Sequence, residues 1–149
     1  MSEFETHLNT LLVDVFHKIL RFEEVTLKSI LGMSITVTEA HILDVIGKHN
    51  ENITVSEVAS TLNVSVPTVT VAVKKLQSKG FITKTSCADD GRRFIIGLTE
   101  SGKKICRAHD LFHRKMVRDL SRDLSDAEKE VLLSGVKKLN DFFGKKAEG

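Results

Sequence analysis

Side chains able to contact a nucleic acid are concentrated between residues 54 and 93. Hydroxyl groups can bond base edges or phosphates, and lysine and arginine are attracted to phosphates. The candidate DNA-contacting residues are Thr54, Ser65, Pro67, Thr68, Thr70, Lys74, Lys75, Asp90, Gly91, Arg92 and Arg93. Residues 54–104 carry eight Lys/Arg against four Asp/Glu, whereas residues 1–53 carry four against eight. A locally basic middle in a chain of net charge +2 indicates contact with a polyanion through one segment.

The run from residue 55 to residue 70 has the layout of a helix-turn-helix. Small Ala59 lets the second helix approach the first, and Asn63 tolerates the left-handed backbone of a tight turn. Val64 and Val69 are apolar where the two helices close on a shared core. The second helix can then place its N-terminal residues in a DNA major groove. The alternative is an ordinary helical hairpin with an amphipathic surface.

A β-hairpin is predicted directly after this motif. Residues 81–85 and 94–96 are short β-branched or aromatic runs, and turn residues separate them. A hairpin that follows a recognition helix is a wing, and an arginine at its tip can enter the minor groove. Arg92 and Arg93 lie at or just past the turn, and Asp90 can orient Arg92 through a salt bridge. The alternative is a solvated turn with incidental charges.

Helices are expected to position these residues. Ser or Thr precedes Glu by three residues at four places, and each pair can form a capping box at a helix start. The pairs are Ser2–Glu5, Thr36–Glu39, Thr54–Glu57 and Ser125–Glu128. The apolar spacing predicts helices over about 3–30, after Thr36, 55–62, from Ser65 to about 79, 100–120 and 126–144. The predicted fold is therefore mainly α with a small β-wing, a winged helix-turn-helix flanked by N- and C-terminal helices.

Composition excludes several classes of protein. A single proline argues against a β-sandwich, and no apolar stretch approaches the ~18 residues of a membrane span. The two cysteines, Cys87 and Cys106, fit a reducing compartment, and without a signal peptide the expected location is the cytoplasm. No catalytic motif is present, so neither an enzyme nor a cofactor is expected. An architectural DNA-binding protein would need a more extended basic surface.

Three short motifs resemble the signature of the MarR-type winged-helix repressors. They are Leu76-x3-Gly80-Phe81-Ile82, Asp90-Gly91-Arg92 and Leu98-Thr99-Glu100-x-Gly102. The resemblance implies a homodimer of one domain, 1–149, that binds a palindromic operator in double-stranded DNA. Residues 1–32 and 100–149 would supply the dimerisation helices, and 36–99 the DNA-binding lobe. Lys84 stands where the family usually has arginine, which should weaken a phosphate contact.

Three further stretches resemble the repressors of bacterial fatty-acid synthesis within this family. They are Phe22–Leu27, Glu39–Lys48 and Arg107–Val117. This resemblance implies long-chain acyl-acyl carrier protein as corepressor. The predicted effector pocket consists of Phe16, Leu20, His41, Ile42, Ile46, His109, Phe112, His113 and Met116. The predicted contact with the acidic carrier protein consists of Arg107, Arg114, Lys115 and Arg118. The alternative is that these residues are plain dimer core and a solvated charged face.

Other effectors are small aromatic ligands, metals and oxidants. His109 and His113 are spaced as a metal-ligand pair, which His41 could join, but their neighbours are apolar and no dense ligand cluster is present. No metal site is therefore predicted. A redox sensor needs an activated thiolate, and neither cysteine occupies the first-helix position used by the oxidant-sensing members of the family.

Overall fold

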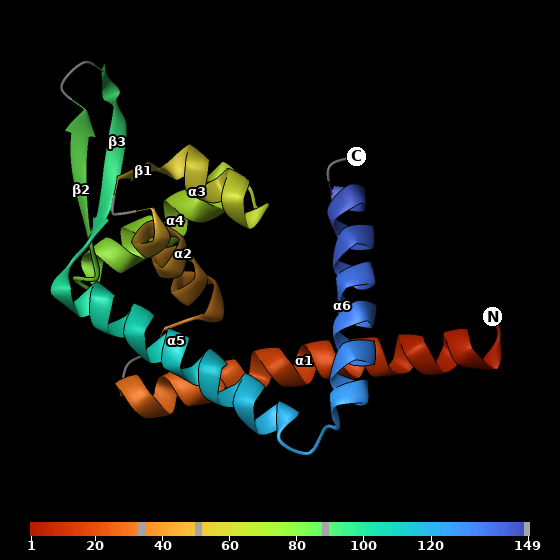
Figure 1. The fold of residues 1–149 in the computed structure, drawn as a ribbon. Coiled ribbons are helices and arrows are strands. Elements are labelled where there is room, and N and C mark those ends of the chain that lie inside the picture. The colour runs from red at the N-terminus through yellow and green to blue at the C-terminus, as the bar shows by residue number, and fades with distance from the viewer. Residues whose placement is uncertain (33–34, 50–51, 88–89, 148–149) are drawn as a thin grey trace. The chain divides into compact units, whose positions relative to one another are not determined.

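The computed structural model of the chain describes residues 1–32, 35–49, 52–87 and 90–147 (Figure 1). The chain divides into two compact units, residues 1–110 and residues 111–149. The elements in chain order are α1 (Glu3–Leu31), α2 (Val37–Lys48), β1 (Ile53–Thr54), α3 (Val55–Leu62), α4 (Val66–Ser78), β2 (Ile82–Cys87), β3 (Asp90–Leu98), α5 (Glu100–Ser121) and α6 (Asp126–Ala147). These elements confirm the predicted winged helix-turn-helix fold. No helix in the described ranges is both long and apolar enough to cross a membrane.

The helix starts follow the predicted capping boxes. At Ser2, Thr36 and Thr54 the hydroxyl accepts a hydrogen bond from the N3 amide, and the N3 glutamate accepts one from the N-cap amide. Ser125 and Glu128 make the same reciprocal pair before α6. These bonds satisfy amides that have no partner within the helix, so short sequence patterns set the helix boundaries.

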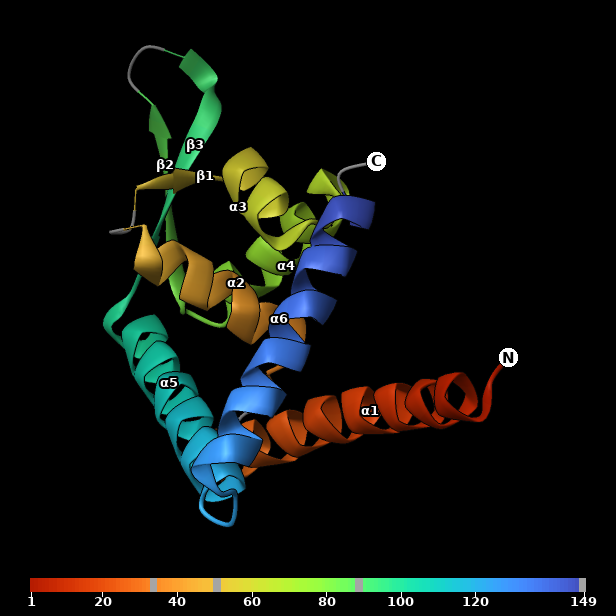
Figure 2. The ribbon, with the colours of Figure 1, turned by 45° about the vertical axis from the view of Figure 1, so that its right-hand side comes forward.

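The sheet has three antiparallel strands in the order β1-β3-β2. Strand β3 begins at Asp90, four residues before the predicted start, so Arg92 and Arg93 lie in a strand rather than in the turn. The two-residue strand β1 pairs Ile53 with Ile96 and was not predicted, because two residues carry no readable alternation. In both ribbon views α2, α3 and α4 lie on the same side of this sheet (Figures 1 and 2).

The core of the first unit forms where these helices meet the sheet. Fully buried side chains come from α2, α3, α4, β1 and β3: Ile42, Leu43, Ile46, Val58, Val69, Leu76, Ile53 and Ile96. Ile42 and Ile46, which were predicted to line an effector channel, are fully buried in this core. The apolar face of α2 is covered by α3, α4 and β3, and the predicted role of the two isoleucines in an effector pocket stays a prediction.

The junction between the wing and α5 is closed by hydrogen bonds. The Thr99 amide donates to the Phe81 carbonyl at 3.0 Å, and the Thr99 hydroxyl donates to the Gly80 carbonyl at 2.6 Å. The same hydroxyl accepts from the Gly102 amide at 3.1 Å, which caps the start of α5. A Cβ on Gly102 would lie 2.1 Å from the Phe81 carbonyl oxygen, so only glycine permits this approach.

Large apolar side chains remain exposed on α1 and α6. In the second unit, no residue of α6 is buried, and Val131 and Leu133 expose 74% and 72% of their surface. In the first unit, Phe4 and Phe16 on α1 expose 71% and 61%. Apolar surface of this extent on a chain usually marks an interface with a protein partner.

We expect Gly102→Ala to destabilise the protein, because the added methyl group would collide with backbone that cannot yield. The cost should reach or exceed the about 1–3 kcal/mol typical of overpacking, measured as the free energy of unfolding in urea. Gly135→Ala in α6 is the matched control, since a Cβ there meets nothing within 4 Å. Equal stability of the two variants would contradict this account of the junction.

Candidate nucleic-acid interface and effector groove

The predicted recognition helix is α4, and local hydrogen bonds hold its exposed hydroxyls. Ser65 is the N-cap and accepts from the Thr68 amide at 3.3 Å, while its hydroxyl lies 2.7 Å from the Thr68 hydroxyl. The Thr70 hydroxyl donates to the Val66 carbonyl at 2.9 Å. Pro67 occupies the first turn, where its missing amide breaks no helical bond. These groups are therefore already oriented on the helix before any ligand arrives.

The outward surface of α4 contains more than the predicted residues. Lys74 and Lys75 are exposed as expected, and Val66 and Val71 are exposed as well, at 45% and 54%. Val71 follows Thr68 by three residues, so both lie on one side of the helix. An apolar side chain on a reading surface can contact the thymine methyl group. Sequence analysis missed the two valines because apolar helix residues are normally assigned to the core.

An ion pair fixes the C-terminal end of α4 against α2. Lys79 Nζ donates to Glu39 Oε2 at 2.8 Å, and the Glu39 side chain is almost fully buried. The same oxygen accepts from the Thr36 amide at 3.0 Å, as part of the capping box of α2. One buried carboxylate therefore ties the start of α2 to the end of the recognition helix.

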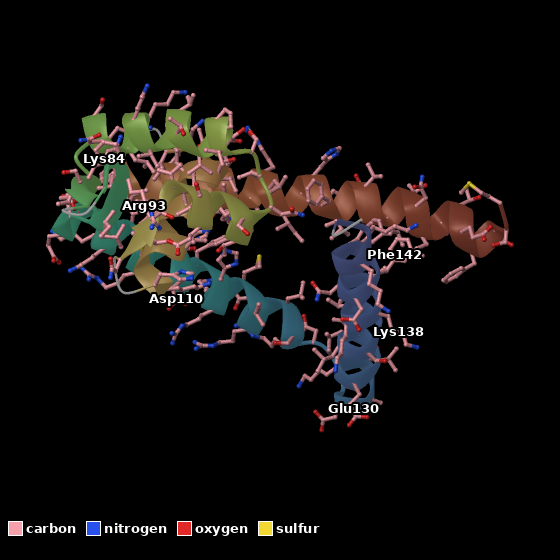
Figure 3. All side chains as sticks on the ribbon, turned by 90° about the horizontal axis from the view of Figure 1, so that it is seen from above. Lys84, Arg93, Asp110, Glu130, Lys138 and Phe142 are labelled. Atoms are coloured by element: carbon pink, nitrogen blue, oxygen red, sulfur yellow. The ribbon has the colours of Figure 1, made fainter. Side chains whose placement is uncertain are left out.

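The wing is the β2–β3 hairpin, and its described side chains include the cations Lys84 and Arg93. Lys84 Nζ lies 4.0 Å from the centre of the Phe94 ring on the adjacent strand. Arg93 is exposed (Figure 3). The pKa of Glu57 is lowered, first by hydrogen bonds from the Thr54 amide and hydroxyl, then by charges that include Arg93. Thr54, a predicted DNA contact, thus uses its hydroxyl to cap α3.

The predicted Asp90–Arg92 salt bridge lies outside the described side chains. The backbone of Asp90, Gly91 and Arg92 lies in β3. The predicted contact of this motif with DNA therefore stays a prediction.

A cluster of four polar side chains joins three helices of the first unit. We call it the clasp: Glu23 on α1, His41 and Asp44 on α2, and His109 on α5. His41 Nε2 lies 3.0 Å from Glu23 Oε1, and His109 is hydrogen-bonded to Glu23 through Nε2 and to Asp44 through Nδ1. Glu23 and His109 are 2% and 1% exposed. Both histidines were predicted from the sequence as effector-pocket residues, whereas the two carboxylates were not predicted as site residues.

The clasp favours the protonated form of His109. Both nitrogens of His109 face a carboxylate oxygen, and a neutral imidazole, which has one donor nitrogen, could donate to only one of the two. Burial alone would lower the pKa of His109. The hydrogen bonds to Asp44 and Glu23, together with their charges, outweigh burial and raise it above the ordinary value.

Cys106 contacts the same cluster and is unreactive. Burial, followed by the charge and hydrogen bond of Asp44, raises the pKa of its thiol to about 12. A thiol with this pKa holds very little thiolate at neutral pH, and the thiolate is the nucleophile. This finding supports the expectation that Cys106 is not a redox sensor, and the side chain of Cys87 lies outside the description.

Three of the predicted effector residues border one open groove. Phe16, Leu20 and His41 line a hollow of about 570 Å³ between α1 and α2. The other lining residues are His17, Arg21, Glu24, Val37 and Thr38. We call this hollow the α1–α2 groove. It combines apolar walls with hydrogen-bonding groups, as sites for small molecules and cofactors commonly do.

The remaining predicted effector residues do not line this groove. His109 is buried in the clasp. Phe112, His113 and Met116 belong to the second unit, where the Phe112 ring meets the His113 ring edge-on at 5.1 Å. Their predicted place in a common pocket stays a prediction.

The predicted carrier-protein contacts all lie on α5. Arg107 donates to Glu100 at 3.1 Å, and Lys115 donates to Asp119 at 2.7 Å. Arg114 and Arg118 are exposed. Pairing within the helix reduces the net positive field, so the attraction to an acidic partner would come from the excess of cations on α5.

The clasp also contains the residue types that bind zinc. Imidazole nitrogens of His41 and His109 converge on one oxygen of Glu23, and zinc takes both kinds of ligand. A metal would have to displace the His109 proton that the two carboxylates hold in place. The expectation of no metal therefore stays a prediction, and the clasp is the place to test it.

The helix-turn-helix α3–α4 followed by the β2–β3 hairpin defines the winged helix-turn-helix class of DNA-binding proteins. The MarR family model matches residues 32–93, and Streptococcus pneumoniae FabT, solved in complex with DNA, is 33% identical with a TM-score of 0.88. That comparison covers 95% of this chain and 98% of FabT. The chain belongs to the MarR family of transcriptional regulators.

Two bacterial regulators are similar in sequence. The HTH-type regulator YhjH of Bacillus subtilis is 35% identical over 81 residues, which are 54% of this chain and 46% of YhjH. The chain thus spans less than half the length of this relative. The regulator ZitR of Lactococcus lactis is 28% identical over 133 residues, covering 84% of this chain and 90% of ZitR.

We expect the clasp to stabilise the protein more at low pH than at high pH. The pKa of His109 is raised on folding, so its contribution is fully present below the ordinary histidine pKa of about 6.5 and is lost as pH rises through the folded value. His109→Gln should cost about 3–5 kcal/mol near pH 6, because it leaves a buried carboxylate without its charged partner.

The measurement is the free energy of urea unfolding of both proteins from pH 6 to pH 9. The difference between wild type and His109→Gln should shrink as pH rises. His7→Gln, an exposed substitution on α1, should show a small difference at every pH. A difference for His109→Gln that stayed constant with pH would show that folding does not raise the pKa of His109.

Proposed function

We propose that the chain is a homodimeric, sequence-specific transcriptional repressor. The observation that carries the proposal is the exposed surface of α4, with oriented hydroxyls at its N-terminal end and Lys74 and Lys75 further along, beside a wing that carries adjacent arginines. Two recognition helices would enter successive major grooves about 34 Å apart on a palindromic operator. The two wings would place Arg92 or Arg93 in the flanking minor grooves.

The exposed apolar faces of α1 and α6 support the homodimer. Burying such surface against a second copy of the chain gains roughly 25 cal/mol per Å². In this assembly, residues 1–32 and 100–149 would supply the dimerisation helices and residues 36–99 the DNA-binding lobe. Cytoplasmic location follows from a role on DNA.

Long-chain acyl-acyl carrier protein is proposed as the corepressor. The resemblance of three stretches to fatty-acid synthesis repressors supports this choice, as do the similarity to FabT and the α1–α2 groove. An acyl chain gains about 0.8 kcal/mol per buried CH₂, so a long chain can supply substantial binding energy. A corepressor must bind the DNA-competent conformation more tightly than the alternative, because only a difference in affinity shifts the population.

We expect Arg92→Ala to weaken operator binding by about 1–3 kcal/mol, because a minor-groove contact would be lost. The measurement is a gel shift with the operator at fixed salt. Lys104→Ala, which removes the same charge from the exposed surface of α5, is the matched control and should change affinity less. Equal affinities of Arg92→Ala and wild type, with the fold intact, would disprove the wing assignment.

Palmitoyl-acyl carrier protein should tighten operator binding in the same assay, whereas the unacylated carrier should not, because only the acyl chain fills an apolar groove. Native mass spectrometry of the protein with each carrier reports the dimer and the bound ligand together. Zinc should leave operator affinity nearly unchanged. Identical effects of the two carriers would remove the acyl proposal, and strong dependence on zinc would replace it with a metal-responsive regulator that uses the clasp.

A further inference from the structure

The clasp has one end in each of two grooves of the first unit. His41 is 40% exposed and lines the α1–α2 groove. Asp44 is 23% exposed and lines a second groove of about 420 Å³, whose other walls are Gly47, Lys48, Leu98, Lys103, Cys106, Arg107 and Asp110. Glu23 and His109 lie between them and are almost completely buried. The four side chains thus form a continuous hydrogen-bonded path through the protein, from one groove to the other.

Glu23 Oε1 is the shared point of this path. It accepts from His41 Nε2 at 3.0 Å and also from His109 Nε2. Because an ionised carboxylate only accepts, the proton between Glu23 and His41 is on His41 Nε2. A group that drew this N–H away from Glu23 would leave the carboxylate with one hydrogen-bond donor fewer. In a buried network, losing one partner changes the strength of the bonds that remain.

The hydrogen bond from His41 to Glu23 matters because the clasp is rich in acidic groups. Two acidic side chains, Glu23 and Asp44, contact the imidazole of His109, so acidic groups outnumber the imidazole that lies between them. The hydrogen bond from His41 partly compensates the excess, in a place where solvent reaches Glu23 very little. Removing this hydrogen bond is therefore costly. Its presence or absence changes the strength of the hydrogen bonds that His109 makes in the same network.

His109 lies on the helix that follows the wing. Helix α5 begins at Glu100, two residues after β3 ends, and continues to Ser121 in the second unit. The bonds from His109 to Glu23 and Asp44 hold the first part of α5 to α1 and α2. A change in these bonds therefore acts where α5 leaves the DNA-binding lobe.

We propose that His41 is a positioning residue that couples the contents of the α1–α2 groove to the attachment of α5 through the clasp. The ligand class is an apolar chain that ends in a hydrogen-bond acceptor, such as the thioester carbonyl of an acyl group, which takes the His41 N–H. The identity of this ligand rests on the proposed function, whereas the coupling between His41 and the rest of the clasp is a property of the chain alone.

The first experiment compares His41→Ala with His41→Gln. Glutamine places an amide N–H near the position of His41 Nε2–H, whereas alanine has no donor. Operator affinity is measured without and with saturating palmitoyl-acyl carrier protein. Wild type should tighten by at least about five-fold, the lower end of usual allosteric coupling. His41→Ala should tighten less than about two-fold at saturation, and His41→Gln should recover most of the wild-type response.

The second experiment needs no ligand. The unfolding equilibrium constants of wild type, His41→Ala, Asp44→Asn and the double variant form a double-mutant cycle. The effect of the double variant should differ from the product of the single effects by more than about two-fold, because the two residues share one network. Thr38→Ala, which lines the same groove and is exposed, should combine with Asp44→Asn multiplicatively.

The outcomes separate the two proposals. If wild type does not bind palmitoyl-acyl carrier protein, the proposed corepressor is wrong and the cycle alone decides the coupling. A multiplicative His41–Asp44 cycle overturns the inference. A wild-type response to the acylated carrier that His41→Ala retains in full also overturns it.

Discussion

The contact of the His109 imidazole with two carboxylates joins three helices of the first unit. His109 meets Glu23 on one side and Asp44 on the other, so α1, α2 and α5 share one buried charge cluster. An ion cluster of this kind gains little net stability over well-packed apolar residues, but losing one member is costly. Its contribution is therefore geometric: it prescribes which residues of the three helices must lie together.

Local hydrogen bonds, rather than a buried charge cluster, orient the side chains of the proposed DNA-facing surface. Ser65, Thr68 and Thr70 satisfy neighbouring helical groups through local bonds, and Pro67 stiffens the first turn. Side chains held in this way lose less conformational entropy on binding than free ones. Glu39 and Lys79 fix the far end of the same helix. Side-chain bonds thus hold the recognition helix at both ends, and the predicted DNA contacts Ser65 and Thr68 take part in those at its N-terminal end.

Local features could be predicted from the sequence, and contacts distant along the chain could not. The capping boxes join residues three apart, so Thr36 and Glu39 are visible as a pair in the sequence. Glu23 and His109 are 86 positions apart, and nothing local marks Glu23 as a buried partner. For Ile42 and Ile46, helical spacing in the sequence identifies an apolar face of the helix. It does not identify which neighbouring element covers that face. Val71 was not predicted as a surface residue, because its spacing in the sequence does not reveal that this side of α4 is left exposed.

The closed junction at the base of the wing has a consequence for how such proteins can change. Thr99 bonds back to Gly80 and Phe81, so the residues where the hairpin begins and ends are joined directly to each other. Because both ends are fastened there, residues can be added to or removed from the outer part of the hairpin without altering the path from α4 to α5. The wing is in this sense an interchangeable module: its length and tip chemistry can diverge, or be grafted from a relative, while the scaffold that carries it remains constant.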